Sequence, residues 1–154
     1  MRFICDTMLG RLAKYLRILG LDTIYVRSMS DLNGYEADIE TPYFFTKRKM
    51  QRTSYVNSHY IKADDVVGQL KEIKEIILPH ISESTLMNRC LRCNAILRDV
   101  DKDDVESFVP EFVFHRYVAF KLCPTCNKVY WGGSHIDHMN EWVKEMTESM
   151  GDAK

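Results

Sequence analysis

The sequence has no marked excess of either charge. It contains 21 Lys and Arg residues against 22 Asp and Glu residues, which gives a formal net charge of -1, and 28% of its residues are charged. Composition alone therefore shows neither the basic bias of many polyanion-binding proteins nor the high net charge of disordered chains. With 45% hydrophobic residues, the chain has enough apolar side chains to build a folded core.

Long apolar runs are also missing. No stretch approaches the roughly 20 apolar residues that a membrane-spanning helix requires. The amino terminus lacks the basic segment, apolar run and small residues of a secretory leader. We therefore expect a soluble protein of the cytoplasm, and the absence of repeats or low-complexity tracts is consistent with ordinary globular structure.

Short apolar runs alternate with helical spacing through the first half of the chain. This alternation predicts an α/β fold with a small, mainly parallel sheet flanked by helices. We expect strands at residues 2–5, 23–26, 43–46 and within 55–61, and helices at residues 8–19, 30–40 and from Asp64 or Asp65 to about 78. The polar segment 81–88 then separates a first unit, residues 1–80, from a second unit, residues 86–148, that ends in a helix.

The first expected helix has a clear apolar stripe. Apolar residues within 8–19 recur on one helical face, and Arg17 falls elsewhere around the axis. Asp6 and Thr7 precede the helix and can cap its free amides. Gly20 stands where a left-handed C-terminal cap belongs.

Four of the five cysteines form two Cys-x-x-Cys pairs, Cys90 with Cys93 and Cys123 with Cys126. In a chain without an export signal this spacing is typical of metal ligands rather than disulfides. An asparagine, which tolerates left-handed backbone, follows each pair, so each pair can form a tight turn that presents two thiolates. Four thiolates predict a structural zinc ion, and iron also suits such a site. The alternatives are two redox pairs or unrelated core thiols.

Such an ion would also support folding. The second unit is too short to bury much apolar surface, so metal binding should contribute a large part of its folding free energy. Cys5 stands apart from the two pairs, within the first expected strand. We interpret it as a small core thiol rather than a reactive one.

Asp6 follows the first expected strand directly. In open parallel sheets, ligands bind beyond the carboxyl ends of the strands, so a carboxylate at this position is placed for catalysis or metal binding. The alternative is that Asp6 only caps the following helix.

Several motifs occur in a fixed order along the chain. They are residues 3–17 with the run Met-Leu-Gly-Arg-Leu, Asp64-Asp65 with Gln69-Leu70, the first cysteine pair with Asn94 and Leu97, Val109-Pro110, and residues 123–135 with the run Tyr-Trp-Gly-Gly-Ser-His. Together they resemble the RNase domain family named for the carboxy-terminal part of the Mut-seven exonuclease. The resemblance implies a PIN-like nuclease fold followed by a zinc ribbon.

The resemblance also implies a cluster of carboxylates that holds one or two divalent ions, Mg or Mn. In such nucleases the ions activate a water molecule and stabilise the phosphate at which hydrolysis occurs. By resemblance, Asp6 takes the first acidic position, Asp31 the second, and Asp64 or Asp65 the last.

One acidic position of the family is changed in this chain. After the third strand the family usually reads Thr-Arg-Asp, whereas this chain reads Thr46-Lys47-Arg48. Arg48 therefore stands where a metal ligand is expected. A guanidinium at this place would compete with a metal for Asp6, and it could pair with phosphate directly.

Two groups of residues are candidates for RNA contacts. Aromatic and histidine rings such as those of Trp131 and His135 can stack on unpaired bases, or the segment 130–135 could instead form the core of the zinc unit. Basic residues near the expected carboxyl ends of the strands could contact phosphates or could simply form a solvated charged face. These basic candidates are Arg11, Lys14, Lys47, Arg48, Lys49 and Arg52.

The sequence therefore predicts an RNA-acting protein with structural zinc, a metal-dependent endoribonuclease that uses Mg or Mn and has an altered active site. The first alternative is a catalytically silent RNA-binding module in which Arg48 replaces metal charge with a fixed cation. The second is a protein-interaction scaffold stabilised by zinc.

Overall fold

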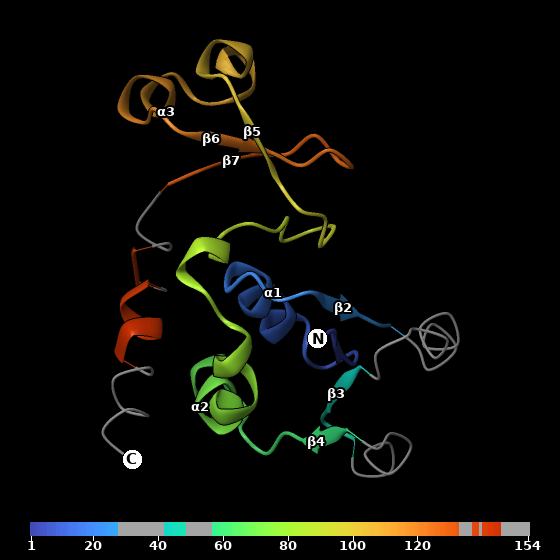
Figure 1. The fold of residues 1–154 in the computed structure, drawn as a ribbon. Coiled ribbons are helices and arrows are strands. Elements are labelled where there is room, and N and C mark those ends of the chain that lie inside the picture. Colours follow the sequence, from blue (N-terminus) through green and yellow to red (C-terminus); the bar gives the residue numbers. More distant parts are fainter. Residues whose placement is uncertain (28–41, 49–56, 133–136, 139, 146–154) are drawn as a thin grey trace.

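The computed structural model describes residues 1–27, 42–48, 57–132, 137–138 and 140–145. Two sheets organise this part of the chain (Figure 1). The first sheet has the strand order β2-β1-β3-β4 and is parallel throughout; its strands are β1 (Phe3–Cys5), β2 (Thr23–Tyr25), β3 (Tyr43–Thr46) and β4 (Ser58–Tyr60). The predicted α/β fold class and its four strands are confirmed.

The second sheet is smaller and antiparallel. It has the order β5-β6-β7, with β5 (Arg98–Val100), β6 (Phe120–Leu122) and β7 (Val129–Trp131). Figure 1 shows this sheet and helix α3 (Glu111–Arg116) at one end of the molecule, and the first sheet with α1 (Gly10–Ile18) and α2 (Val66–Ile77) at the other. Short 3-10 turns lie at Leu78–His80, Glu83–Thr85, Lys102–Asp104 and Glu106–Phe108.

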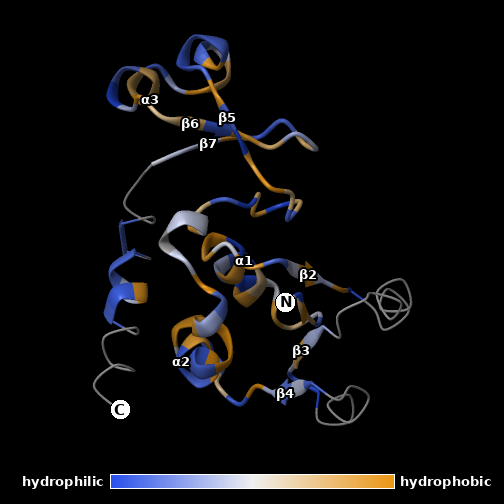
Figure 2. Cartoon of the chain, viewed as in Figure 1, coloured by the Kyte–Doolittle hydropathy of each residue, from blue (hydrophilic) through white to orange (hydrophobic). Residues whose placement is uncertain are grey.

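Alternation along the strands places side chains on the two faces of the first sheet. Phe3, Cys5 and Phe45 belong to the main core, which includes the apolar faces of α1 and α2, whereas Ile4 and Phe44 belong to a smaller cluster on the other face. Figure 2 shows the apolar sides of both helices turned toward the interior. Because both faces of these short strands are buried, their sequences read as continuous apolar runs.

The ends of α1 differ in part from the prediction. The helix begins at Gly10 with Leu9 at the N-cap position, where no side chain caps it, so the expected capping by Asp6 and Thr7 is wrong. The physical reason is that Asp6 lies three residues before that position and its carboxylate accepts from Met8 N instead. At the other end Gly20 has φ +83°, and a Cβ there would lie 2.1 Å from the carbonyl oxygen of Thr85, so only glycine fits.

Two further local predictions can be compared with the structure. Asp65 caps α2 by accepting a hydrogen bond from Gly68 N, as its position predicted. The helix expected at residues 30–40 lies outside the described residues. Within the part of the chain that the structure describes, no helix combines the length and apolar character of a membrane span.

The start of the second unit is fastened to α1 and β2. Met87 N donates to the carbonyl of Ile18, and Asn94 accepts from Thr23 N through its side-chain oxygen. Later in the chain, residues 137–138 and 140–145 are helical, and Val143 belongs to the core of the first sheet. Residues on either side of the segment 81–88 therefore contact each other. The division into units at 1–80 and 86–148 stays a prediction.

Candidate metal centre and candidate active edge

The four cysteines of the two pairs converge on one point. All four Sγ atoms of Cys90, Cys93, Cys123 and Cys126 lie within 4.8 Å of one another, and those of Cys90 and Cys126 are 3.7 Å apart. A tetrahedral zinc ion with Zn–S bonds of about 2.3 Å separates its sulfur ligands by about 3.8 Å. The cluster therefore has the dimensions of a four-thiolate metal site, and it could hold a metal such as zinc.

The backbone turns that carry these sulfurs are built alike. Cys93 N donates to the Cys90 sulfur at 3.3 Å, and Cys126 N donates to the Cys123 sulfur at 3.5 Å. Each turn closes with an asparagine in the left-handed region, at φ 66° for Asn94 and 63° for Asn127. The asparagines predicted to tolerate this conformation therefore adopt it.

Tyr130 completes the surroundings of Cys90. Its hydroxyl lies 3.1 Å from the Cys90 sulfur and accepts from Leu91 N at 3.0 Å. Burial raises the pKa of Cys90, but hydrogen bonds from Tyr130 and from the amides of Cys93 and Arg92 outweigh it, and the net effect lowers that pKa to about 6. These hydrogen bonds stabilise the Cys90 thiolate, the form of cysteine that binds metals. The neighbouring sulfur of Cys126 and burial raise the pKa of Cys93 to about 12, so within this cluster the lowered pKa belongs to Cys90. Sequence reasoning missed this role of Tyr130.

Asp6 lies at the carboxyl end of the central strand β1. The residue is only 3% exposed, and both of its carboxylate oxygens are engaged. Oδ2 accepts from the Thr46 hydroxyl at the end of β3, at 2.5 Å, and Oδ1 accepts from Met8 N at 3.3 Å. Two neighbouring strand ends therefore orient this buried carboxylate.

Two cations follow Thr46 at the same edge. Lys47 pairs with Asp64 at 2.7 Å, and the hydrogen bond and charge of Lys47 lower the pKa of Asp64. Arg48 Nη2 donates to the Thr7 hydroxyl at 3.2 Å, and Arg48 N donates to Thr46 Oγ1 at 2.9 Å. Arg48 therefore lies beside the turn that follows β1, and its hydrogen bonds connect it to Thr7, the residue after Asp6, and to Thr46.

The acidic residues assigned by resemblance do not form a complete cluster in the described part of the chain. Asp65 is the cap of α2, and Asp64 belongs to the pair with Lys47. Within the described residues, the four cysteines are the one group of three or more His, Cys, Asp or Glu side chains close enough to share an ion. Predicted site residues outside the described ranges are Asp31, Lys49, Arg52 and His135.

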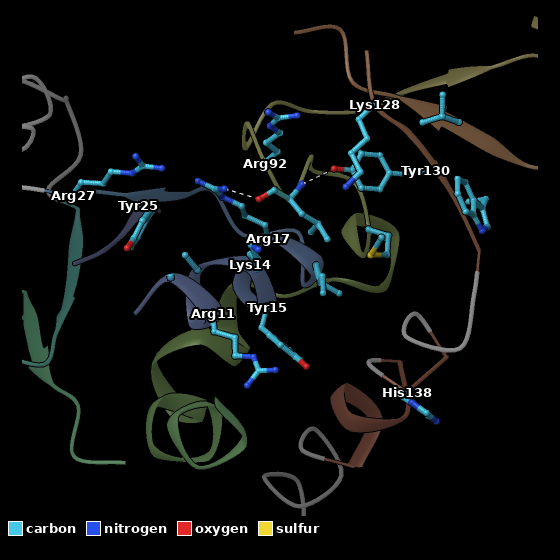
Figure 3. A pocket seen from close by; sticks show the side chains of 17 residues that line it. Arg11, Lys14, Tyr15, Arg17, Tyr25, Arg27, Arg92, Lys128, Tyr130 and His138 are labelled. Carbon is cyan, nitrogen blue, oxygen red and sulfur yellow. Dashed lines mark hydrogen bonds between the residues drawn. The ribbon is translucent and has the colours of Figure 1, made fainter. Parts of the chain in front are cut away.

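Three of the described RNA-contact candidates line one cavity. This cavity of about 950 Å³ lies between α1, the end of β2 and the cysteine-bearing unit (Figure 3). Arg11, Lys14 and Trp131 contribute to its wall, and Lys47 and Arg48 do not. The basic residues expected on one surface are therefore divided between the sheet edge and this cavity.

A parallel sheet with a buried aspartate at its carboxyl edge, joined to a small sheet that carries four clustered cysteines, fits the expected PIN-like domain followed by a zinc ribbon. The family model described as the Mut7-C RNAse domain matches residues 1–143. The chain belongs to this family. A search of curated proteins and a search of solved structures each found no match.

Proposed function

We propose that this protein is a ribonuclease and that it acts on RNA at the carboxyl edge of the four-stranded sheet. The observation that carries the proposal is Asp6: a carboxylate directly after the inner strand β1, buried and oriented by Thr46, at the edge where open parallel sheets bind their ligands. Membership of the Mut7-C RNAse domain family supports hydrolysis of RNA as the reaction.

The described carboxylates do not provide a complete site for Mg or Mn. Asp6 has both oxygens engaged, Asp64 is 97% exposed and paired with Lys47, and Asp65 caps a helix. A divalent ion at Asp6 would need a further carboxylate, and Asp31, which lies outside the described residues, is the candidate from the sequence.

The test is a cleavage assay on a mixed-sequence, single-stranded RNA with added Mn or Mg. We expect internal cuts by the wild-type protein and no cuts by Asp6→Asn, which keeps the shape of the side chain and removes its charge. Asp99→Asn is a matched control, because Asp99 is exposed on β5 in the second sheet. Cleavage that survives Asp6→Asn, or a wild-type protein that never cuts, would overturn the proposal.

A second candidate is an RNA-binding module without hydrolysis. The ion pair between Lys47 and Asp64 favours it, because a lysine already neutralises a carboxylate expected to bind metal. Arg48→Asp restores the family's usual residue at the altered position, and it separates the two candidates. A nuclease with an impaired site should cut RNA faster after this change. A binding module should still show no cleavage, and it should bind RNA more weakly because a cation is lost.

We further propose that zinc is the metal of the four cysteines and that its role is structural. Four thiolates fill the tetrahedral shell and leave no position for water or substrate. Zinc thiolates of this kind suit a reducing compartment, so we also propose a cytoplasmic location.

A further inference from the structure

The cavity beside α1 differs in charge from the chain as a whole. The full sequence is nearly balanced, at 21 basic against 22 acidic residues, yet among the residues that the structure describes, no Asp or Glu belongs to the cavity wall. Six basic side chains do, and they come from α1, from the end of β2 and from the cysteine-bearing unit: Arg11, Lys14, Arg17, Arg27, Arg92 and Lys128. We infer that this cavity is a binding groove for single-stranded RNA leading to Asp6; the inference rests on the proposed action on RNA.

Most of these cations are available at the surface. Arg11, Lys14, Arg92 and Lys128 are exposed, whereas Arg17 is 9% exposed and its guanidinium donates to the carbonyls of Thr23 and Leu91. The first four can therefore contact phosphates, and Arg17 supplies positive charge from beneath. Figure 3 shows Arg92 and Lys128 on one side of the groove and Arg11 and Lys14 on α1. A polyanion in the groove would meet positive charge from both sides.

Aromatic rings also line the groove. Tyr15, Tyr25, Tyr130 and Trp131 all belong to the wall, and the Lys128 ammonium lies 5.2 Å from the centre of the Tyr130 ring. Trp131 is half-buried against the core of the second sheet, which fixes its ring at the groove. Cations and rings in one groove suit an unpaired strand, because phosphates bind the charges and bases stack on the rings. A duplex keeps its bases stacked inside and cannot use the rings.

The groove ends beside the proposed active edge. Tyr25 lies next to Cys5 in the strand register, and the Tyr25 hydroxyl donates to the carbonyl of Thr7 at 2.7 Å. The side chain of the same Thr7 accepts from Arg48, and Asp6 immediately precedes it. A strand lying in the groove therefore reaches the carboxyl end of β1 within one residue of Asp6.

The test measures RNA binding by fluorescence anisotropy, without added Mg or Mn, so that cleavage cannot interfere. We expect the wild-type protein to prefer a single-stranded oligoribonucleotide over a blunt duplex of the same sequence. The variant Lys14→Glu with Lys128→Glu reverses one charge on each side of the groove. It should weaken binding of the single strand about tenfold or more and make the salt dependence less steep by about 1.4 in the log–log slope, since each lost phosphate contact is worth about 0.7.

The control variant is Lys71→Glu with Arg98→Glu. It changes the net charge equally, at two exposed positions outside the groove on α2 and β5, and it should bind RNA almost as the wild type does. A second measurement needs no groove substitution: in Trp142→Phe, which leaves Trp131 as the remaining tryptophan, single-stranded RNA should quench the fluorescence. Quenching reports stacking on Trp131 directly.

The outcomes separate the groove from the proposed reaction. The groove would be overturned if the two double variants weakened RNA binding equally, if Lys14→Glu with Lys128→Glu did not weaken it, or if RNA did not quench the fluorescence. Each of these results would count against the groove even if the wild type cuts RNA and that cutting depends on Asp6. Selective weakening together with quenching, in a protein that never cuts RNA, would support the groove and overturn the proposed hydrolysis.

Discussion

Thr46 and Asp6 join the ends of two adjacent parallel strands through a hydrogen bond from the Thr46 hydroxyl to Asp6 Oδ2. Thr46 is fully buried and Asp6 nearly so, so a hydroxyl at this position offsets part of the cost of burying a carboxylate. The pair explains how an acidic residue is held at the carboxyl end of a small apolar sheet.

Replacing Thr46 by Val removes that donor and keeps the shape of the side chain. We expect the free energy of unfolding at pH 7 to fall by about 1–3 kcal/mol, because a buried carboxylate loses a hydrogen bond. Urea unfolding followed by circular dichroism measures the change. Thr46→Ser keeps the hydroxyl and should lose much less; an equal loss in both variants would show that packing of the methyl group, rather than the hydrogen bond, matters.

Arg17 connects α1 to the first cysteine turn. It donates to the carbonyl of Thr23 at 3.0 Å and to that of Leu91 at 2.7 Å, and burial lowers its pKa. Arg17→Met keeps an apolar stem without either bond. We expect the free energy of unfolding to fall by about 2–4 kcal/mol, since one buried and one partly buried carbonyl lose a charged donor, with faster amide hydrogen exchange in residues 88–97. Arg11→Met, at an exposed position on the same helix, should leave both unchanged; unaltered exchange in Arg17→Met would contradict this connecting role.

Glu72 fixes the chain after β4 and should make stability depend on pH. Burial raises its pKa, but hydrogen bonds from His59 and from the amides of Lys62 and Ala63 outweigh it, so the net pKa is lowered. A lowered pKa means that the stabilisation is present above the unfolded value of about 4.3 and is lost as pH falls through the folded value.

We therefore expect Glu72→Gln to reduce the free energy of unfolding by about 1–3 kcal/mol at pH 7 and to match the wild type once the pH is below the folded pKa of Glu72. Urea unfolding across this pH range provides the measurement. Glu75→Gln, exposed on the same helix, should follow the wild type at every pH. A difference for Glu72→Gln that persists unchanged into acid would show that its charge is not the cause.

Local patterns predicted much of the structure from the sequence. Apolar runs predicted strands β1 and β3, since a buried parallel strand leaves a continuous apolar signature. The edge strand β4 is partly buried and has the sequence Ser-His-Tyr, so the sequence placed it only within residues 55–61. The Cys-x-x-Cys-Asn repeats predicted both the sulfur cluster and the left-handed asparagines, because those features are set by neighbouring residues.

The features that were missed depend on contacts between distant parts of the chain. Arg17 falls outside the apolar stripe of α1, yet its partner Leu91, 74 residues away, makes it a buried residue. Tyr130 binds the sulfur of Cys90 from 40 residues away. Arg92 and Lys128 belong to the cysteine-bearing unit and Lys14 to α1. They line the same cavity because the second unit packs against α1. Periodicity along one segment carries no information about such pairings.

The cluster of four cysteines stabilises the unit that forms one wall of the groove. The metal content of the purified protein is therefore the most direct test of the claim that these cysteines hold a structural zinc ion. Mass spectrometry of metals in the freshly purified wild-type protein should find one zinc ion per chain. The control variant Cys5→Ala, which changes the fully buried fifth cysteine, should retain this ion. The variant Cys123→Ser should lose both the ion and the fold of the second unit. Purified wild-type protein without bound metal, or a Cys123→Ser variant that keeps one zinc ion per chain, would contradict a structural zinc site at the four cysteines.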